Sequence, residues 1–333
     1  MAQVTFEEIS ASDYISLYNQ GYSINELKKI MDCSYTYTRN MLLKNGAKLR
    51  TRKEAFINMI SRHPEWKKQF LKYVISPESR QLSDSKIKLL FLLFTEGCIW
   101  KSKVQFTNNQ AILRDFFSAL MKEVYNVDTK TNGNVTYVHS IEIANDLRTY
   151  NIKEMIPEEV MCKLLKSPQL TKEVLRIFAD TEGAVIISVR KAPRNYTVGD
   201  RRIVIACTND IVKSQLITLL KSLEITARLG KDGVLITNEH SLREFAQQIG
   251  FSRGIRVLRK KAGYGIWYMY EKATLVRLLI RIYDKQINNG RGGKHLGVFQ
   301  NCKNKEDVLK ILDFWYNELK RGDEIWLRQH LKR

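Results

Sequence analysis

The hydrophobic and polar positions divide the chain into helical and strand-like segments. Apolar residues recur at helical spacing over residues 24–30, and long apolar stretches end at Glu96 and at Glu182. Alternating stretches that predict strands follow the second of these, over residues 184–190 and 202–208. Five prolines mark the boundaries, because proline disfavours helix interiors and central strands. The pattern predicts an N-terminal module, two mixed units and a C-terminal helical tail.

The two mixed units repeat each other. Their shared anchors occur in the same order, and they are Thr95-Glu96-Gly97 with Thr181-Glu182-Gly183, Thr107-Asn108 with Thr208-Asn209, Asn132-Gly133 with Asp232-Gly233, and His139-Ser140 with His240-Ser241. Asn-Gly and Asp-Gly are favoured two-residue hairpin turns. Each unit therefore predicts helix, two strands, helix, two strands and helix. The expected fold class is α+β, with two αββαββα repeats.

The N-terminal module has the spacing of a helix-turn-helix. Ser23 and Glu26 form a capping box, and Ser34 can cap a second helix that stops before Asn45-Gly46. Polar side chains near the start of that helix would face base edges, and they are Tyr35, Thr36, Arg39 and Asn40. A basic arm follows, formed by Lys48, Arg50 and Arg52. The pattern resembles the resolvase and invertase type of DNA-binding module; the alternative is an ordinary helical hairpin with solvated charges.

The repeated helix endings resemble the motif of the LAGLIDADG homing endonucleases. Residues 89–97 match its first copy, residues 175–183 match its second, and the resemblance spans residues 84–262. It implies that two motif helices pack side by side and bring the catalytic, metal-binding carboxylates Glu96 and Glu182 together. The match departs from the pattern at Phe94, where the second copy has Asp180, and in a very short first hairpin over residues 98–106.

The chemistry of paired carboxylates favours a divalent cation. Two carboxylates at helix C-termini repel each other and oppose the helix dipoles. Mg²⁺ prefers carboxylate, water and phosphate oxygens, and it can activate water for attack on a phosphodiester. The family usually adds a basic residue beyond the last helix of a repeat, which makes Lys153 and Arg256, or Arg253, candidates. Gly97 and Gly183 are expected to leave their helices in a left-handed conformation.

In that family the paired sheets form a saddle over the major groove. The resemblance therefore implies DNA contacts from the basic hairpin tips, which in the second repeat carry Arg190, Lys191, Arg194, Asn195, Arg201 and Arg202, and in the first repeat Lys101 and Lys103. Arginine and lysine can read guanine edges or hold phosphates, and asparagine can read adenine. The alternative is a solvated hairpin tip.

Charge and composition favour a nucleic-acid partner. The chain carries 55 Lys and Arg against 35 Asp and Glu, a net charge of +20 at pH 7, and its tail over residues 253–333 carries 19 Lys and Arg against 8 Asp and Glu. A hydrophobic fraction of 44% excludes wholesale disorder. Binding to a membrane surface is the competing interpretation, but no lipidation motif or membrane-spanning stretch is evident. The five scattered cysteines predict neither a zinc site nor disulfides, which fits an intracellular location in the cytoplasm or nucleoid, with no targeting signal.

These observations predict six segments: a helix-turn-helix over residues 1–60, a linker over 61–84, a first repeat over 85–156, a linker over 157–168, a second repeat over 169–262 and a basic helical extension over 263–333. The expected function is site-specific, Mg²⁺-dependent cleavage of double-stranded DNA by a monomer with internal pseudo-twofold symmetry. The alternatives are a DNA-binding transcriptional regulator that keeps the fold without the nuclease, and a maturase that binds structured intron RNA.

Overall fold

The chain forms two compact units, residues 1–74 and 75–333, and each is described by itself. The computed structural model describes residues 11–62, 75–151, 154–193, 195–258, 267–289, 293–295 and 297–330. Among these residues, no helix combines the length and the apolar character that crossing a lipid bilayer requires.

The described residues 11–62 of the smaller unit form the helices α1 (Ala11–Asn19), α2 (Ile24–Ile30), α3 (Tyr35–Lys44) and α4 (Arg52–Arg62). The predicted capping box is present, since Ser23 Oγ accepts from Glu26 N and Glu26 Oε2 accepts from Ser23 N. Ser34 caps α3 as expected. A small core of Tyr18, Leu27, Leu42 and Ala47 holds the helices together.

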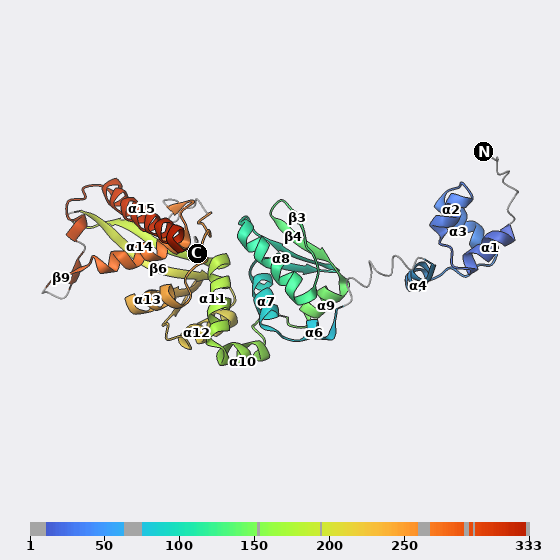
Figure 1. Cartoon of the computed structure of the whole chain (residues 1–333), viewed down its shortest axis with the longest axis horizontal. Helices are drawn as coiled ribbons and strands as arrows, with labels where there is room; N and C mark the ends of the chain where they lie inside the picture. Colours follow the sequence, from blue (N-terminus) through green and yellow to red (C-terminus); the bar gives the residue numbers. More distant parts are fainter. Residues whose placement is uncertain are drawn as a thin grey trace. The chain divides into compact units, whose positions relative to one another are not determined.

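The larger unit contains the αββαββα order twice (Figure 1). The first copy consists of α7 (Asp84–Glu96), β1 (Gly97–Trp100), β2 (Lys103–Thr107), α8 (Ala111–Tyr125), β3 (Lys130–Asn132), β4 (Val135–His139) and α9 (Ile141–Arg148). The second copy consists of α11 (Pro168–Glu182), β5 (Gly183–Lys191), β6 (Tyr196–Ala206), α12 (Asp210–Lys221), β7 (Arg228–Gly230), β8 (Gly233–Ile236) and α13 (Glu239–Gln248). The short helix α6 (Pro77–Arg80) precedes the first copy, and the segment expected to link the copies forms a helix, α10 (Glu158–Lys166). The predicted α+β fold class is confirmed.

Each copy builds one antiparallel four-stranded sheet with the same topology. The strand orders are β1-β2-β4-β3 and β5-β6-β8-β7. Alternate residues of β2 and β4, among them Val104, Phe106 and Val138, are buried beneath the helices, and the residues between them lie on the open face. The first sheet therefore has one face covered by helices and one open face.

The hairpins differ in detail from the sequence prediction. Asn132 pairs with Val135 and Gly230 pairs with Gly233, so the two-residue turns are 133–134 and 231–232 rather than Asn132-Gly133 and Asp232-Gly233. The strand β6 already begins at Tyr196 and shortens the expected loop of the long hairpin. The N-cap of α13 is Asn238, whose side chain accepts from Ser241 N.

The C-terminal extension packs against the long hairpin of the second copy. It contains α14 (Lys272–Asp284), β9 (Ile287–Asn289), β10 (Gly293–His295), a 3-10 turn (Gly297–Phe299) and α15 (Lys305–His330). Trp267 Nε1 donates to Ile187 O at 2.9 Å, and Tyr196 N donates to Cys302 O at 3.0 Å. Buried Val308, Leu312 and Trp315 form the inner side of α15. The extension therefore supports β5 and β6 beyond the edge of the repeat itself.

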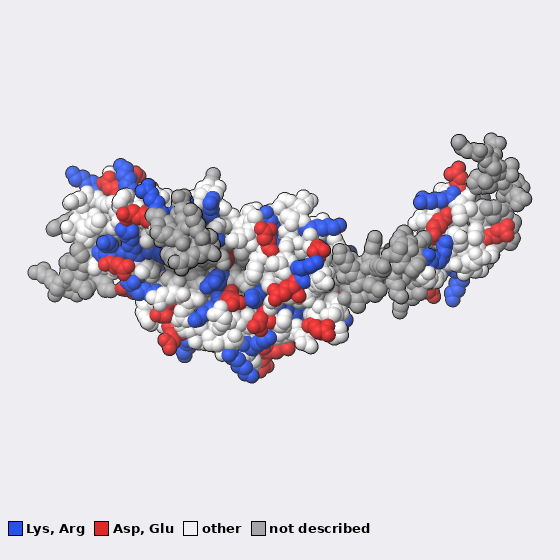
Figure 2. Space-filling view, in the orientation of Figure 1, with Lys and Arg blue, Asp and Glu red and all other residues white. Residues whose placement is uncertain are grey.

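Positive charge is spread over the face of the larger unit that Figure 2 draws. On the face drawn in Figure 2, Lys and Arg side chains lie among Asp and Glu side chains and do not form one uninterrupted basic surface. Net charge alone therefore does not place a binding site, and the placement depends on the individual elements.

Candidate functional site

The first helices of the two repeats pack side by side at the centre of the larger unit. Phe178 of α11 lies against Phe91 and Phe94 of α7, with ring centroids 6.4 and 5.4 Å apart. Lys88 of α7 pairs with Glu173 of α11 at 2.9 Å. Because the two helices are equivalent in the two repeats, their C-terminal residues Glu96 and Glu182 occupy corresponding positions.

Both helices end because the next residue is a glycine that turns directly into a strand. The expected left-handed exit is wrong, since Gly97 has φ −92° and Gly183 has φ −79°, both in the extended region. The requirement for glycine is one of space. A Cβ on Gly97 would lie 2.3 Å from Leu93 Cα, and a Cβ on Gly183 would lie 2.3 Å from Ala179 O. The tight helix-to-strand junction places each glutamate at the edge of its sheet.

Glu96 and Glu182 line the same cavity, which has a volume of about 300 Å³. Arg256, Lys272, Asn108 and Gln110 also line it. Arg256 is one of the basic residues expected beyond the last helix of a repeat, whereas Lys153 lies outside the described residues. The cavity therefore combines two carboxylates, two cationic side chains and three amides, the third being that of Asn109.

A chain of hydrogen bonds runs across this cavity. Asn108 Nδ2 donates to Glu96 Oε2, and Asn108 Oδ1 accepts from Gln110 N at 2.7 Å. Gln110 Oε1 accepts from Arg256 N at 2.7 Å. These bonds fix the Glu96 carboxylate to Asn108 within the first repeat, and they join the first repeat to the segment that carries Arg256.

Lys272 is a cavity residue that the sequence analysis did not identify. Its side chain is buried, and Nζ donates to Asp180 O at 2.8 Å. The carboxylate of Asp180 accepts from Ser252 N at 2.8 Å, and burial raises the pKa of that carboxyl group. No sequence signal marked Lys272, since it is far from Glu182 along the chain and sits at the start of an ordinary amphipathic helix.

The donor set of the cavity fits a hard divalent cation. Within the described ranges, no group of three or more His, Cys, Asp or Glu side chains is arranged to hold a metal ion. If the shared cavity holds a cation, Glu96 and Glu182 would supply the carboxylate ligands, and water and phosphate oxygens would complete the shell. Such a shell is typical of Mg²⁺, which usually binds one or two carboxylates and keeps several waters.

The environment of the two glutamates is asymmetric. Glu182 also lines a second cavity of about 310 Å³, together with Phe94, Phe178, Asn209 and Asp232. Among the described residues that line this second cavity, none is a lysine or arginine. The cationic side chains therefore gather in the cavity that the two glutamates share.

The structure separates the hairpin residues expected to contact DNA. Arg190 and Lys191 are exposed, and Arg202 pairs with Asp200 at 3.1 Å. Arg201 instead lies 4.3 Å from the ring of Tyr283 in α14.

Asn195 Nδ2 donates to Phe299 O of the C-terminal extension. Arg194 lies outside the described residues. In the first repeat, Lys101 is exposed at the turn and Lys103 lies on the open face of the sheet.

In the smaller unit, the polar residues at the start of α3 face outward as expected. Tyr35, Thr36, Arg39 and Asn40 are all exposed, whereas Thr38 and Leu42 are buried. Lys48 is exposed, but Arg50 donates to Gly21 O and Tyr22 O and lies 4.1 Å from the ring of Tyr18. The side chain of Arg50 therefore joins the segment after α3 to the connection between α1 and α2. Arg52 begins α4, and its side chain lies outside the described part of the structure.

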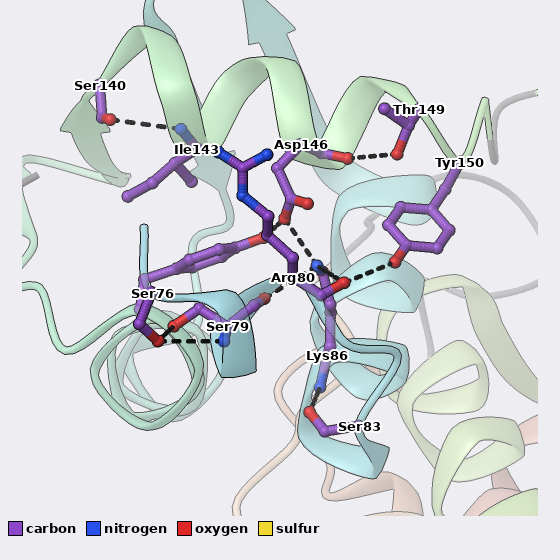
Figure 3. Close-up of polar contacts among 11 residues, drawn as sticks. Ser76, Ser79, Arg80, Ser83, Lys86, Ser140, Ile143, Asp146, Thr149 and Tyr150 are labelled. Atoms are coloured by element: carbon purple, nitrogen blue, oxygen red, sulfur yellow. Dashed lines mark hydrogen bonds and ion pairs between the residues drawn. The ribbon is translucent and has the colours of Figure 1, made fainter. Parts of the chain in front are cut away.

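A second buried ionic cluster lies near the N-terminal end of α7 (Figure 3). Lys86 is fully buried and pairs with Asp146 Oδ2 at 2.6 Å, and its Nζ also donates to Ser79 O and Arg80 O. Tyr125 Oη donates to the same Asp146 oxygen at 2.5 Å, and burial raises the pKa of Tyr125. All three ammonium hydrogens of Lys86 have acceptors, so the cluster anchors α6, α7 and α9 to one another.

Comparisons with known proteins give similarity to solved structures only. No protein-family model and no curated protein matches the chain. One similar structure is that of the homing endonuclease I-DmoI in complex with DNA and Mn, at 14% identity and a TM-score of 0.34, over 51% of this chain and 97% of that one. Another is the N-terminal LAGLIDADG domain of DUF199/WhiA, at 15% identity and a TM-score of 0.33, over 55% of this chain and 92% of that one. A mutant of I-SmaMI matches at 12% identity and a TM-score of 0.38, over 72% and 98%. The assignment of the site therefore rests on the geometry of this chain.

Proposed function

We propose that the chain is a LAGLIDADG-type, metal-dependent endonuclease that cleaves double-stranded DNA at specific sites. The observation that carries this proposal is the shared cavity. Glu96 and Glu182 end two equivalent, packed helices and line one cavity with Arg256 and Lys272. Carboxylate oxygens are ligands that Mg²⁺ prefers, so the two glutamates support a divalent metal ion at this cavity.

Each of these residues of the cavity would have its own role in cleavage. Glu96 and Glu182 would hold Mg²⁺, which when bound would supply Lewis-acid activation of the phosphodiester and of water. Arg256 would hold the scissile phosphate through charge-assisted hydrogen bonds. Lys272, fixed by Asp180 O, would place positive charge near the leaving oxygen. Asn108 would keep the Glu96 carboxylate oriented.

One chain supplies both carboxylates, so we expect a monomer to be active. The longer hairpin of the second repeat would contribute most of the contacts to DNA, through Arg190, Lys191 and Arg202. The smaller unit would act as a helix-turn-helix that contacts an adjacent stretch of the same DNA through Arg39 and Asn40. Two linked modules strengthen binding through their effective concentration.

A DNA-binding regulator without nuclease activity is the second candidate, and an intron RNA maturase is a further alternative. The asymmetry of the two cavities favours these candidates, because cationic side chains accompany the glutamates on one side only. A nuclease that cuts both strands would be expected to place such groups near both scissile phosphates.

Selection from a randomised duplex library separates these functions. The full chain is incubated with the library with and without Mg²⁺, and bound and cut molecules are both sequenced. The endonuclease proposal expects one enriched motif that is cut only with Mg²⁺. A motif that is bound but never cut would support the regulator, and enrichment of no duplex would support the maturase. Arg39→Ala should lose preference on one flank of the motif only; an unchanged motif would remove the helix-turn-helix from the proposal.

A further inference from the structure

The open face of the first sheet carries aromatic and basic side chains in two neighbouring cross-strand rows. The first row is Trp100, Lys103 and His139, and the second is Cys98, Gln105, Tyr137 and Lys130. Adjacent rows on one face of a sheet lie within reach of long and aromatic side chains. These residues therefore form one continuous surface, called here the aromatic face.

Trp100 is unusually exposed for its type, with 66% of its surface accessible at the end of the hairpin. Each aromatic ring has a cation beside it, because Lys101 Nζ lies 5.1 Å from the Trp100 ring and Lys103 Nζ lies 4.6 Å from the Tyr137 ring. The rings of His139 and Tyr137 meet edge to face, and their centroids lie 5.5 Å apart. Aromatic platforms flanked by positive charge are the arrangement that stacks bases while holding the backbone.

The second sheet has no aromatic residue at the corresponding positions. Counted from the Glu-Gly junction and along the same pairing, Ile186 stands where the first sheet has Trp100, and Leu235 stands where it has Tyr137. The basic position is kept, as Arg202 in place of Lys103. The repeat therefore accounts for a basic open face in both sheets, whereas the aromatic pair is specific to the first sheet.

We infer that the aromatic face binds unpaired nucleobases by stacking them on Trp100 and Tyr137. The base faces of a duplex are covered by their neighbours, so only a single strand or a loop can offer them to an aromatic ring. RNA and DNA strands share this chemistry. Such binding does not involve Glu96 or Glu182, so single-strand binding can be tested independently of cleavage.

The test measures binding of short oligonucleotides to the full chain in EDTA. Fluorescence anisotropy follows labelled single strands of about 12 nucleotides, as RNA and as DNA of the same sequence, and the corresponding DNA duplex. The variants are Trp100→Ala and Tyr137→Ala, with Leu235→Ala as the matched control in the second sheet. Trp100→Phe keeps a ring, and Tyr137→Leu keeps the packing of a half-buried side chain without an aromatic ring.

Trp100→Ala, Tyr137→Ala and Tyr137→Leu should each weaken single-strand binding about 5- to 150-fold, while Trp100→Phe keeps most of the affinity. Duplex binding should change less than about threefold, and Leu235→Ala should leave single-strand binding unchanged. Tighter binding of RNA would identify a contact to the 2′-hydroxyl, and equal binding would identify stacking alone. Equal losses on single strand and duplex, unchanged affinity in the aromatic variants, or failure of the wild type to bind single strands would each overturn the inference.

Discussion

Phe178 offers the sharpest test of how the two repeats hold their glutamates together. Its side chain is 1% exposed, and its ring contacts Phe91 and Phe94 across the interface between α7 and α11. Each such aromatic pair contributes about 0.5–1.5 kcal/mol beyond the burial of its area. Phe178→Leu keeps most of the volume but loses both pairs, so the free energy of unfolding should fall by about 1–3 kcal/mol.

Phe94→Leu should cost less, because Phe94 is half-buried, whereas Phe178 is buried and pairs with the rings of both Phe91 and Phe94. The double variant isolates the interaction between the two rings, and the coupling free energy should be about 0.5–1.5 kcal/mol. The assay is guanidinium denaturation of the four proteins, followed by circular dichroism. Strictly additive losses would refute the claim that this ring pair joins the repeats.

Three further predictions concern single contacts. Lys86→Met leaves the carboxylate of Asp146, which is 12% exposed, without its cation, so it should lower the free energy of unfolding by about 3–5 kcal/mol, measured by denaturation. A loss below about 1 kcal/mol would contradict the anchoring role of the cluster. The hydrogen bond from Lys88 holds the pKa of Glu173 below its usual value, so the stabilisation that this carboxylate contributes is present above pH 4.5 and is lost as the pH falls below it. Glu173→Gln should therefore destabilise the protein at about pH 7 and much less at about pH 3. Equal losses of stability at the two pH values would contradict the pairing. Arg202→Ala should weaken DNA binding. The adjacent Arg201→Ala should leave affinity nearly unchanged and lower the melting temperature, because Arg201 packs on Tyr283. The reverse result in affinity and melting measurements would mean that Arg201, and not Arg202, lies on the face of the sheet that contacts DNA.

The architecture of the larger unit could be predicted because the sequence contains the same pattern of elements twice. Repeated Glu-Gly endings and repeated hairpin turns gave the order of elements, and the structure contains that order in both copies. Asn108 and Asn209 illustrate the equivalence, since the Oδ1 of each accepts from the backbone N–H two residues later. Turn positions were missed by one residue because a glycine next to a tight turn can serve either inside it or at its end.

The lining of the cavity that Glu96 and Glu182 share could be predicted only where it depends on local sequence. Glu96 and Glu182 follow from the motif, and Arg256 follows from its place after the last helix. Lys272 could not be found, because it reaches the cavity through the packing of α14 against the second repeat. Arg201 and Arg202 look alike in the sequence, and only the covering of one face by α14 distinguishes them.

The central claim is that Glu96 and Glu182 together hold the metal ion for cleavage. The most direct test measures cleavage and binding by Glu96→Gln and Glu182→Gln on the duplex selected from the library, with cleavage followed in Mg²⁺ and affinity in EDTA. Glutamine keeps the shape and removes the charge that binds the cation. Each variant should lose Mg²⁺-dependent cleavage and keep the affinity of the wild type within about threefold, whereas unchanged cleavage by either variant would contradict the assignment of the site.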